Sequence, residues 1–317
     1  MKFETGKAYV VEFWATWCGP CRVNIPKLTA LQQKYPDKKL TVIGVSVDQG
    51  ADNLEKVRAF VEKQGPKMEY TVALDAGGTM RDYMMAVNRG GIPYAFVIDG
   101  AGKLAWHGHP DDGLKLVAAE VVAGTFDAKK HAERAQKFME LDKKYSEQLQ
   151  DKKWDDAEKT LDEIVKVRPD IENTLLITRF WIRSGGRNDV QGALAFAKQI
   201  SENQMKDDGE SLTLLADKVV GVGTLLPDEQ MFATELAKKA VDVTKGKNTT
   251  ALVVWSEALK REGKFDEAIA ATQKAIEQAD EPMEKKYYEG RMDELKEAKA
   301  KAGKAAETVK PAEPVKP

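Results

Sequence analysis

The chain has only two cysteines, Cys18 and Cys21, and they stand as Cys-Gly-Pro-Cys. A secreted fold held together by disulfides needs more pairs than this, so that class of protein is excluded. The three histidines, His107, His109 and His131, lie far along the chain and lack the spacing of a zinc finger, which makes a four-ligand zinc site a poor interpretation. What remains is a redox-active dithiol or an accidental pair.

The flanking residues place the pair between a strand and a helix. Residues 9–14 form the β-branched and aromatic run of a buried strand, and residues 22–31 have helical spacing. Pro20 falls in the first helical turn, where its missing N–H has no cost. The partial positive charge and unpaired N–H groups of a helix N-terminus stabilise a thiolate and lower its pKa. We therefore predict Cys18 as the nucleophile and Cys21, one turn later, as the resolving thiol. The alternative is an inert buried pair.

The motif and its surroundings carry a family resemblance. Residues 14–21, Trp-Ala-Thr-Trp-Cys-Gly-Pro-Cys, resemble the active-site strand and turn of thioredoxin. Pro26, five residues after Cys21, is similar to the proline that kinks the thioredoxin active-site helix. Residues 91–93, Gly-Ile-Pro, resemble the cis-proline loop that faces the dithiol. The layout is most similar to TlpA-like thiol–disulfide oxidoreductases of the bacterial cell envelope, and the resemblance covers roughly residues 1–125.

The resemblance implies roles for residues around the dithiol. Pro93 would be a cis-proline that presents the backbone of Ile92 to an extended substrate chain, whereas an ordinary trans proline at a strand entry is the alternative. Trp17 would cover the dithiol and shape access to it, although plain packing explains this tryptophan as well. Together with Ile92 and Trp17, the substrate-binding residues would be Gly19 and Pro20.

Glu12 lies six residues before Cys18, where thioredoxin carries a buried aspartate. Strand alternation puts Glu12 on the face of Val10 and Trp14, where burial would raise its pKa and suit it to take the Cys21 proton. A solvent-facing strand residue is the alternative. Two positions depart from the family pattern: Asn24 stands where TlpA-like proteins often have glutamate, and Gly44 where thioredoxin has a lysine. Proton transfer would then rest on Glu12 alone, or on water.

The pattern of the first 125 residues predicts a thioredoxin-like α/β domain. Met80, Met84 and Met85 have helical spacing and are predicted to fill the core. The expected strands are 8–14, 40–47, 70–74, 94–98 and 103–107, and the expected helices are 20–35, 52–64, 78–87 and 112–123.

From residue 126 to residue 300 the chain is charged, rich in alanine and helical in pattern, and residues 301–317 are predicted to form a disordered tail. Two segments, 154–157 and 265–268, share an aromatic residue followed by alanine, with a proline further on. This pattern resembles the tetratricopeptide repeat of helix pairs, with insertions or irregular repeats between the two copies. Such arrays commonly bind peptides or proteins; a structural appendage or a dimerisation surface is the alternative.

Composition limits the remaining classes. A length of 317 residues favours two domains, and a formal net charge of −2 argues against a general nucleic-acid binder. No apolar run approaches the roughly 18–20 residues of a membrane span, and no signal peptide is visible. We predict no metal and no cofactor. The resemblance implies the bacterial cell envelope or periplasm, with the targeting segment absent from this chain, and a cytoplasmic location stays open.

The predicted function is a thiol–disulfide oxidoreductase that reduces disulfides in protein substrates and takes electrons from an upstream thiol donor. The Gly-Pro dipeptide matches thioredoxin itself and favours a reducing couple. The helical region would bind a protein partner. The alternative is a redox-sensitive adaptor in which the helical array is the functional part. A thiol peroxidase is a weaker third hypothesis, because it needs a single peroxidatic cysteine in a different loop.

Overall fold

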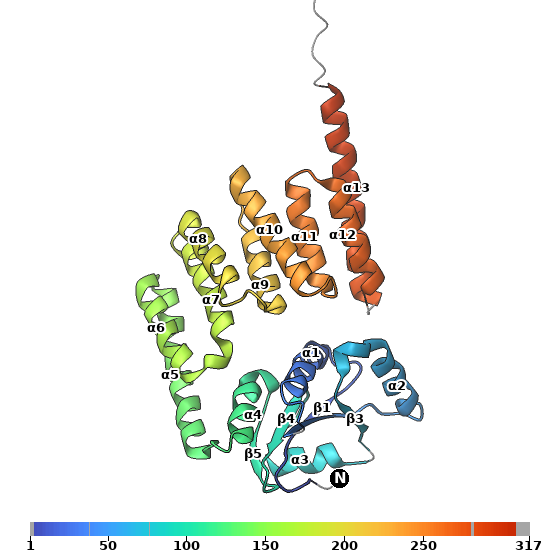
Figure 1. Cartoon of the computed structure of the whole chain (residues 1–317), viewed down its shortest axis with the longest axis vertical. Coiled ribbons are helices and arrows are strands. Elements are labelled where there is room, and N and C mark those ends of the chain that lie inside the picture. The colour runs from blue at the N-terminus through green and yellow to red at the C-terminus, as the bar shows by residue number, and fades with distance from the viewer. Residues whose placement is uncertain (1–2, 38, 76, 280–281, 309–317) are drawn as a thin grey trace, which may run out of the picture. The chain divides into compact units, whose positions relative to one another are not determined.

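The computed structural model describes residues 3–37, 39–75, 77–279 and 282–308, the last five as backbone only. The chain forms two compact units, one of Met1–Lys143 with Glu163–Asp170 and the other of Lys144–Asp162 with Ile171–Pro317. The first is a thioredoxin-like α/β unit and the second is helical, which confirms the predicted fold class (Figure 1). The predicted boundary between residues 125 and 126 stays a prediction.

A five-stranded sheet of order β3-β2-β1-β4-β5 is the frame of the α/β unit. Strand β1 pairs in parallel with β2 and antiparallel with β4, so the strand before the dithiol is central. All seven residues of β1 are buried, as expected for a strand covered on both faces. The strands are β1 (Ala8–Trp14), β2 (Leu40–Ser46), β3 (Thr71–Leu74), β4 (Tyr94–Ile98) and β5 (Leu104–Gly108).

Helices cover both faces of this sheet, and their bounds lie within two residues of the predicted ones. They are α1 (Gly19–Gln33), α2 (Asn53–Gln64), α3 (Thr79–Ala86) and α4 (Leu114–Val122), with 3-10 turns η1 (Gly65–Met68) and η2 (Pro110–Asp112). Helices α1, α2 and α4 pack on the face of Val10 and Trp14, whereas α3 packs on the face of Phe13. Met84 is buried, but Met85 is 72% exposed, so the prediction of a core position was wrong for Met85.

The helical unit is built from successive helices joined by short turns (Figure 1). Helix α5 begins in the first unit and continues into the second. Helix α13 runs to Thr308, into the segment predicted as a disordered tail, and residues 309–317 lie outside the described residues. The helices are α5 (Ala128–Gln150), α6 (Trp154–Val167), α7 (Glu172–Trp181), α8 (Val190–Glu202), α9 (Gly209–Val220), α10 (Pro227–Val243), α11 (Thr249–Arg261), α12 (Phe265–Gln278) and α13 (Pro282–Thr308), with a 3-10 turn η3 (Pro169–Ile171) and a π turn η4 (Ile182–Gly186).

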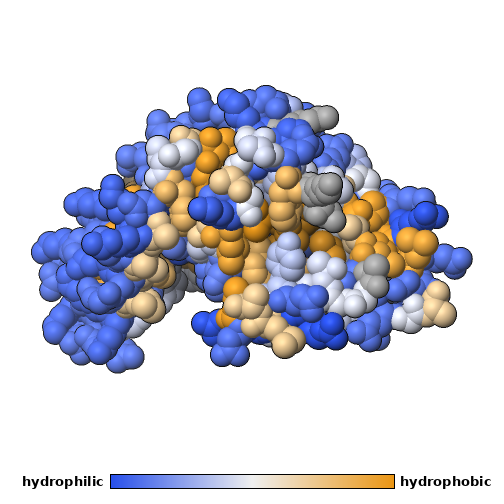
Figure 2. Space-filling model, turned by 90° about the horizontal axis from the view of Figure 1, so that it is seen from below, coloured by the Kyte–Doolittle hydropathy of each residue, from blue (hydrophilic) through white to orange (hydrophobic). Residues whose placement is uncertain are grey.

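Charged residues make up 32% of the chain. Figure 2 shows apolar side chains gathered in patches among hydrophilic ones on the face seen from below. Within the described residues, no helix combines the length and the apolarity that crossing a membrane requires.

Candidate active site

Cys18 and Cys21 form a disulfide bond at the start of α1, with their Cα atoms 5.3 Å apart. Cys18 is the N-cap residue of α1, and its Sγ accepts a hydrogen bond of 3.2 Å from the backbone N–H of Cys21. After reduction the same N–H group would favour the charged form of the Cys18 sulfur. Cys18 is 5% exposed and Cys21 is 1% exposed, so Cys18 is the more accessible of the two cysteines.

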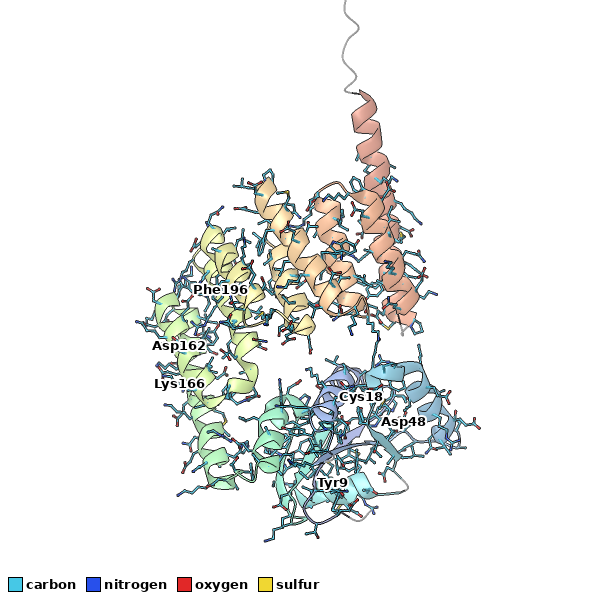
Figure 3. All side chains as sticks on the ribbon, in the orientation of Figure 1. Tyr9, Cys18, Asp48, Asp162, Lys166 and Phe196 are labelled. Atoms are coloured by element: carbon cyan, nitrogen blue, oxygen red, sulfur yellow. A yellow bond between two sulfur atoms is a disulfide. The ribbon has the colours of Figure 1, made fainter. Side chains whose placement is uncertain are left out.

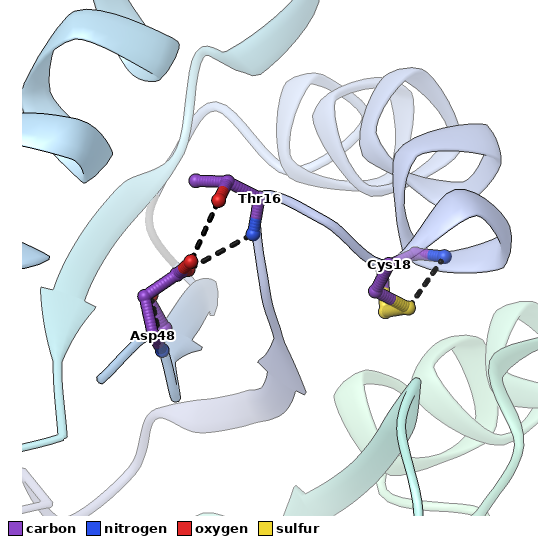
Figure 4. The surroundings of a disulfide bond; sticks show 5 residues. Thr16, Cys18 and Asp48 are labelled. Carbon is purple, nitrogen blue, oxygen red and sulfur yellow. Dashed lines mark hydrogen bonds between the residues drawn. A yellow bond between two sulfur atoms is a disulfide. The ribbon is translucent and has the colours of Figure 1, made fainter. Parts of the chain in front are cut away.

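A buried aspartate fixes the turn before the dithiol. The Asp48 carboxylate accepts hydrogen bonds from the backbone N–H and the hydroxyl of Thr16, at 2.9 and 2.6 Å, and from the hydroxyl of Ser46 at 2.7 Å (Figure 4). Asp48 follows the carboxyl end of β2, and Cys18 begins α1 (Figure 3). This network ties the residues before Cys18 to the neighbouring strand. Sequence reasoning missed the role; its only signal was an aspartate just after a buried strand.

The loop before β4 lies against the dithiol. The Ile92–Pro93 peptide bond is cis and Pro93 is buried. Ile92 is partly buried and packs against the cluster that contains Cys18 and Cys21. The structure therefore brings together the two cysteines and the predicted cis-proline loop, while the role of this loop in substrate binding stays a prediction.

The outer side of the motif is exposed. Trp17 has 70% of its surface exposed, and Gly19 and Pro20 are exposed as well. Val23, on the next turn of α1, is 60% exposed. An apolar surface beside a nearly buried sulfur suits an extended peptide more than a small polar molecule.

Glu12 is buried at the centre of the sheet, with 1% of its surface exposed. It lies opposite Gly44 on β2 and Ala95 on β4, on the face covered by α1. Neither carboxylate oxygen has a hydrogen-bond partner among the described residues. Burial raises the pKa of Glu12 to about 8, so this group can accept or release a proton near neutral pH.

The two departures from the family pattern lie on this same face. Asn24 is 1% exposed, and its Oδ1 has no partner among the described residues. At Gly44 the space that a side chain would take is already filled, because a Cβ atom there would lie 2.8 Å from Cε2 of Tyr70 and 3.1 Å from Nε1 of Trp14. Tyr70 and Trp14 thus occupy the place beside Glu12 where the family pattern has a lysine.

Among the residues that the structure describes, no group of three His, Cys, Asp or Glu side chains is placed to hold a metal ion. Nδ1 of His107 lies 2.8 Å from the hydroxyl of Tyr94, and Nδ1 of His109 accepts a hydrogen bond from the N–H of Asp111. Both histidines therefore have protein partners at the end of the α/β unit.

Comparison with known proteins identifies the family of this site. The model of the AhpC/TSA family matches residues 2–107. Thioredoxin of Coprinus comatus is 39% identical over 75 residues, which are 22% of this chain and 71% of that protein. The chain belongs to the thioredoxin family. The chain is also similar to two bacterial proteins.

One of these is the thioredoxin-like protein YneN of Bacillus subtilis, 33% identical over 97 residues, which are 31% of this chain and 53% of YneN. The other is the thiol-disulfide oxidoreductase ResA of Bacillus anthracis, 31% identical over 104 residues, which are 33% of this chain and 56% of ResA. The chain spans about half the length of these curated relatives. The family model ends at residue 107, before the helical unit begins.

Proposed function

We propose that this protein is a thiol–disulfide oxidoreductase that acts on protein disulfides through Cys18 and Cys21. The observation that carries the proposal is the position of Cys18 as the N-cap residue of α1. Its sulfur forms a disulfide bond with Cys21 and accepts a hydrogen bond from the backbone N–H of Cys21. Ile92, in the loop with the cis peptide bond, packs against the hydrophobic cluster that contains Cys18 and Cys21. Similarity to ResA, whose name is thiol-disulfide oxidoreductase, supports the same reaction class.

The reaction starts from the reduced dithiol. The Cys18 thiolate attacks one sulfur of a substrate disulfide, forms a mixed disulfide and releases the other substrate sulfur as a thiolate. The Cys21 thiol then gives its proton to the Glu12 carboxylate, and the resulting thiolate attacks Sγ of Cys18. This step forms the Cys18–Cys21 disulfide and releases the second substrate thiolate. Two electrons have then passed from the protein to the substrate.

The substrate chain would bind in extended form along the backbone of Ile92, before Pro93. Trp17, Gly19 and Pro20 would contact it on the exposed side of the motif, where the structure has apolar surface. A second thiol protein or small thiol would return the disulfide to the dithiol. The proposed location is the bacterial cell envelope, in keeping with the resemblance to TlpA-like oxidoreductases.

We propose disulfide reduction as the direction of the reaction. The Gly-Pro dipeptide between the cysteines supports a potential near about −270 mV, as in thioredoxin, and not near the −120 mV of a strong oxidant. Equilibration of the full chain with glutathione buffers of known potential measures this value. A potential above about −180 mV would contradict the proposed direction.

Insulin reduction by dithiothreitol tests the enzymatic activity directly. The wild-type chain should accelerate precipitation of the insulin B chain, and Cys18→Ser should abolish the acceleration. Reduced Cys21→Ser, incubated with insulin after dithiothreitol has been removed, should accumulate a covalent adduct with insulin that added dithiothreitol releases. Activity at background level in the wild type, or full activity in Cys18→Ser, would refute the proposal.

We also propose that the helical unit is a tetratricopeptide-like array that binds a protein partner. The two segments that resemble each other fall on α6 and α12, and in each the alanine, Ala157 or Ala268, is fully buried. Small residues at these places let paired helices approach closely. Two adjoining grooves of this unit share Asp217 and Gly221, and Trp181 in one of them is 45% exposed. These grooves are the surface we propose for the partner.

The alternative function is a redox-sensitive adaptor, and the grooves in the helical unit are the observation that favours it. Affinity capture with the full chain separates the two functions when wild type is compared with Cys18→Ser/Cys21→Ser and with Trp181→Ala. A partner kept by the cysteine variant and lost by Trp181→Ala favours the adaptor if the wild type does not reduce insulin. Insulin reduction at the wild-type level in Trp181→Ala favours the oxidoreductase.

A further inference from the structure

Three side chains around Gly44 carry buried polar atoms that have no hydrogen-bond partner among the described residues. They are the carboxylate of Glu12, the indole N–H of Trp14 and the hydroxyl of Tyr70. Buried polar groups in native proteins are almost always paired with protein or with ordered water. A group of unpaired donors and acceptors in one place therefore points to interactions among its members.

Strand pairing brings these groups together. Glu12 on β1 and Gly44 on β2 are register partners, and neighbouring strands lie about 4.8 Å apart. The Cβ direction of Gly44 leads to Cε2 of Tyr70 at 2.8 Å and to Nε1 of Trp14 at 3.1 Å. Since partners on parallel strands face the same side of a sheet, the tyrosine ring and the indole lie within the reach of the Glu12 side chain.

The chemistry of the three groups is complementary. The hydroxyl of Tyr70 and the indole N–H are donors, and a carboxylate is an acceptor with two oxygens. Burial, followed by the charge of Glu12, raises the pKa of the Tyr70 hydroxyl, so this phenol stays protonated and available as a donor. Tyr70 also packs against the cluster that contains both cysteines.

Glu12 has no hydrogen-bond partner among the described residues. Its strand neighbours are Gly44 on β2 and Ala95 on β4. Helix α1 contributes Cys21, which titrates only after reduction, and the neutral amide of Asn24 on its buried face. Burial is the cause of the raised pKa of Glu12, without a contribution from a neighbouring charge.

We propose that Tyr70 and Trp14 are positioning residues for Glu12. Their O–H and N–H groups donate hydrogen bonds through one bound water molecule to the Glu12 carboxylate, and they orient it, once it has ionised, to take the proton of Cys21. This inference rests on the proposed function and names the groups that replace the lysine of the family pattern. Because both groups donate, they favour the charged form of Glu12 and lower the pH at which it acts as a base.

The test uses Tyr70→Phe in the full chain, because phenylalanine keeps the ring over Gly44 and removes only the hydroxyl. The rate of insulin reduction is measured from pH 5 to pH 9 for wild type, Tyr70→Phe, Glu12→Gln and the double variant. One lost hydrogen bond to a charged group should move the midpoint of the pH profile to higher pH by about one unit. In the Glu12→Gln background the Tyr70→Phe change should move nothing.

Tyr35→Phe is the matched control, because Tyr35 is a partly buried tyrosine packed on the same face of the sheet. Its pH profile should equal that of the wild type. A wild-type midpoint in Tyr70→Phe overturns the inference, and so does an equal shift in Tyr35→Phe or in the Glu12→Gln background.

A second measurement is independent of activity. The carboxyl carbon of Glu12, identified by its loss in Glu12→Gln, is titrated by carbon-13 nuclear magnetic resonance in the oxidised full chain. Tyr70→Phe should raise the midpoint of this titration, and an unchanged midpoint overturns the inference. If the wild type fails to reduce insulin, the proposed function fails, while this titration still decides the role of Tyr70.

Discussion

Replacing Glu12 by glutamine should stabilise the oxidised protein at neutral pH. Glutamine has nearly the same size as a protonated glutamic acid but never ionises. In the folded state the Glu12 pKa is about 8, against an ordinary value of 4.5, because the carboxyl group is buried. Between these two values the folded state binds a proton that the unfolded state has lost. Stability therefore falls as the pH rises from 4.5 to about 8, and the loss is complete above that range.

The size of the effect follows from the same two values. At pH 7 the unfolded carboxyl lies about 2.5 pH units above its ordinary pKa, and each unit corresponds to about 1.4 kcal/mol. At pH 7 the free energy of unfolding is therefore about 3 kcal/mol lower than it would be if residue 12 never ionised. Glu12→Gln should recover most of this, and the two proteins should be equally stable near pH 4.5.

Urea unfolding of the oxidised full chain measures the difference. Transitions of wild type and Glu12→Gln are recorded at pH 5, 6, 7 and 8, with near-ultraviolet circular dichroism as the signal, to which buried aromatic residues such as Trp14 contribute. Groups other than Glu12 are common to both proteins and cancel in the difference. A difference that stays constant across this pH range would refute the reasoning, because it would mean that folded Glu12 titrates at its ordinary pKa.

Three further substitutions test the packing around the site and in the helical unit. Gly44→Ala places a methyl group 2.8 Å from the ring of Tyr70 and should lower the free energy of unfolding, measured in urea, by about 1–3 kcal/mol. Its control Gly19→Ala meets nothing within 4 Å and should cost almost nothing, so equal losses would contradict this account. Asp48→Ala removes an acceptor of three hydrogen bonds and should lower the free energy of unfolding by about 2–4 kcal/mol and slow insulin reduction. The control Asp52→Ala, at an exposed aspartate, should change neither. Wild-type stability and rate in Asp48→Ala would show that the network is dispensable. Ser256→Ala should lower the free energy of unfolding of the helical unit by about 1 kcal/mol, because the buried Ser256 hydroxyl on α11 forms hydrogen bonds with Ala268 and Thr272 on α12. An unchanged thermal midpoint would contradict this prediction.

Much of the α/β unit could be predicted because its signals are local. Strand runs such as 8–14 and 94–98 are dense in β-branched and aromatic residues, and their bounds agree with the structure. Helical spacing placed α1 directly after Cys18, with Cys21 in its first turn. Spacing alone does not say which side of a helix faces the core, and for this reason the prediction was right for Met84 and wrong for Met85, which points about 100° away from Met84 around the helix.

The helical unit shows the limit of the same method. The aromatic and alanine pattern selected α6 and α12, and the alanines are buried as the pattern predicts. The helices between these two were not predicted one by one, because that stretch lacks a clear copy of the aromatic and alanine pattern, although its buried residues recur at helical spacing, as in α9 and α10. Asp48 was missed for a related reason: its partner Thr16 lies 32 residues away in the chain.

The order of residues along the chain was enough to predict a dithiol that begins a helix, because the cap, the proline and the strand before it are all within one short segment. It was also enough to put Glu12 on the face of Val10 and Trp14, since side chains alternate along a strand. Only the tertiary structure decided what surrounds that carboxyl group. The register of β1 against β2 sets Gly44 beside Glu12, and the packing of Tyr70 and Trp14 fills that place with two donors in a space closed to solvent. A shift of that register by one residue would turn the whole set to the other face, and no local pattern contains this choice.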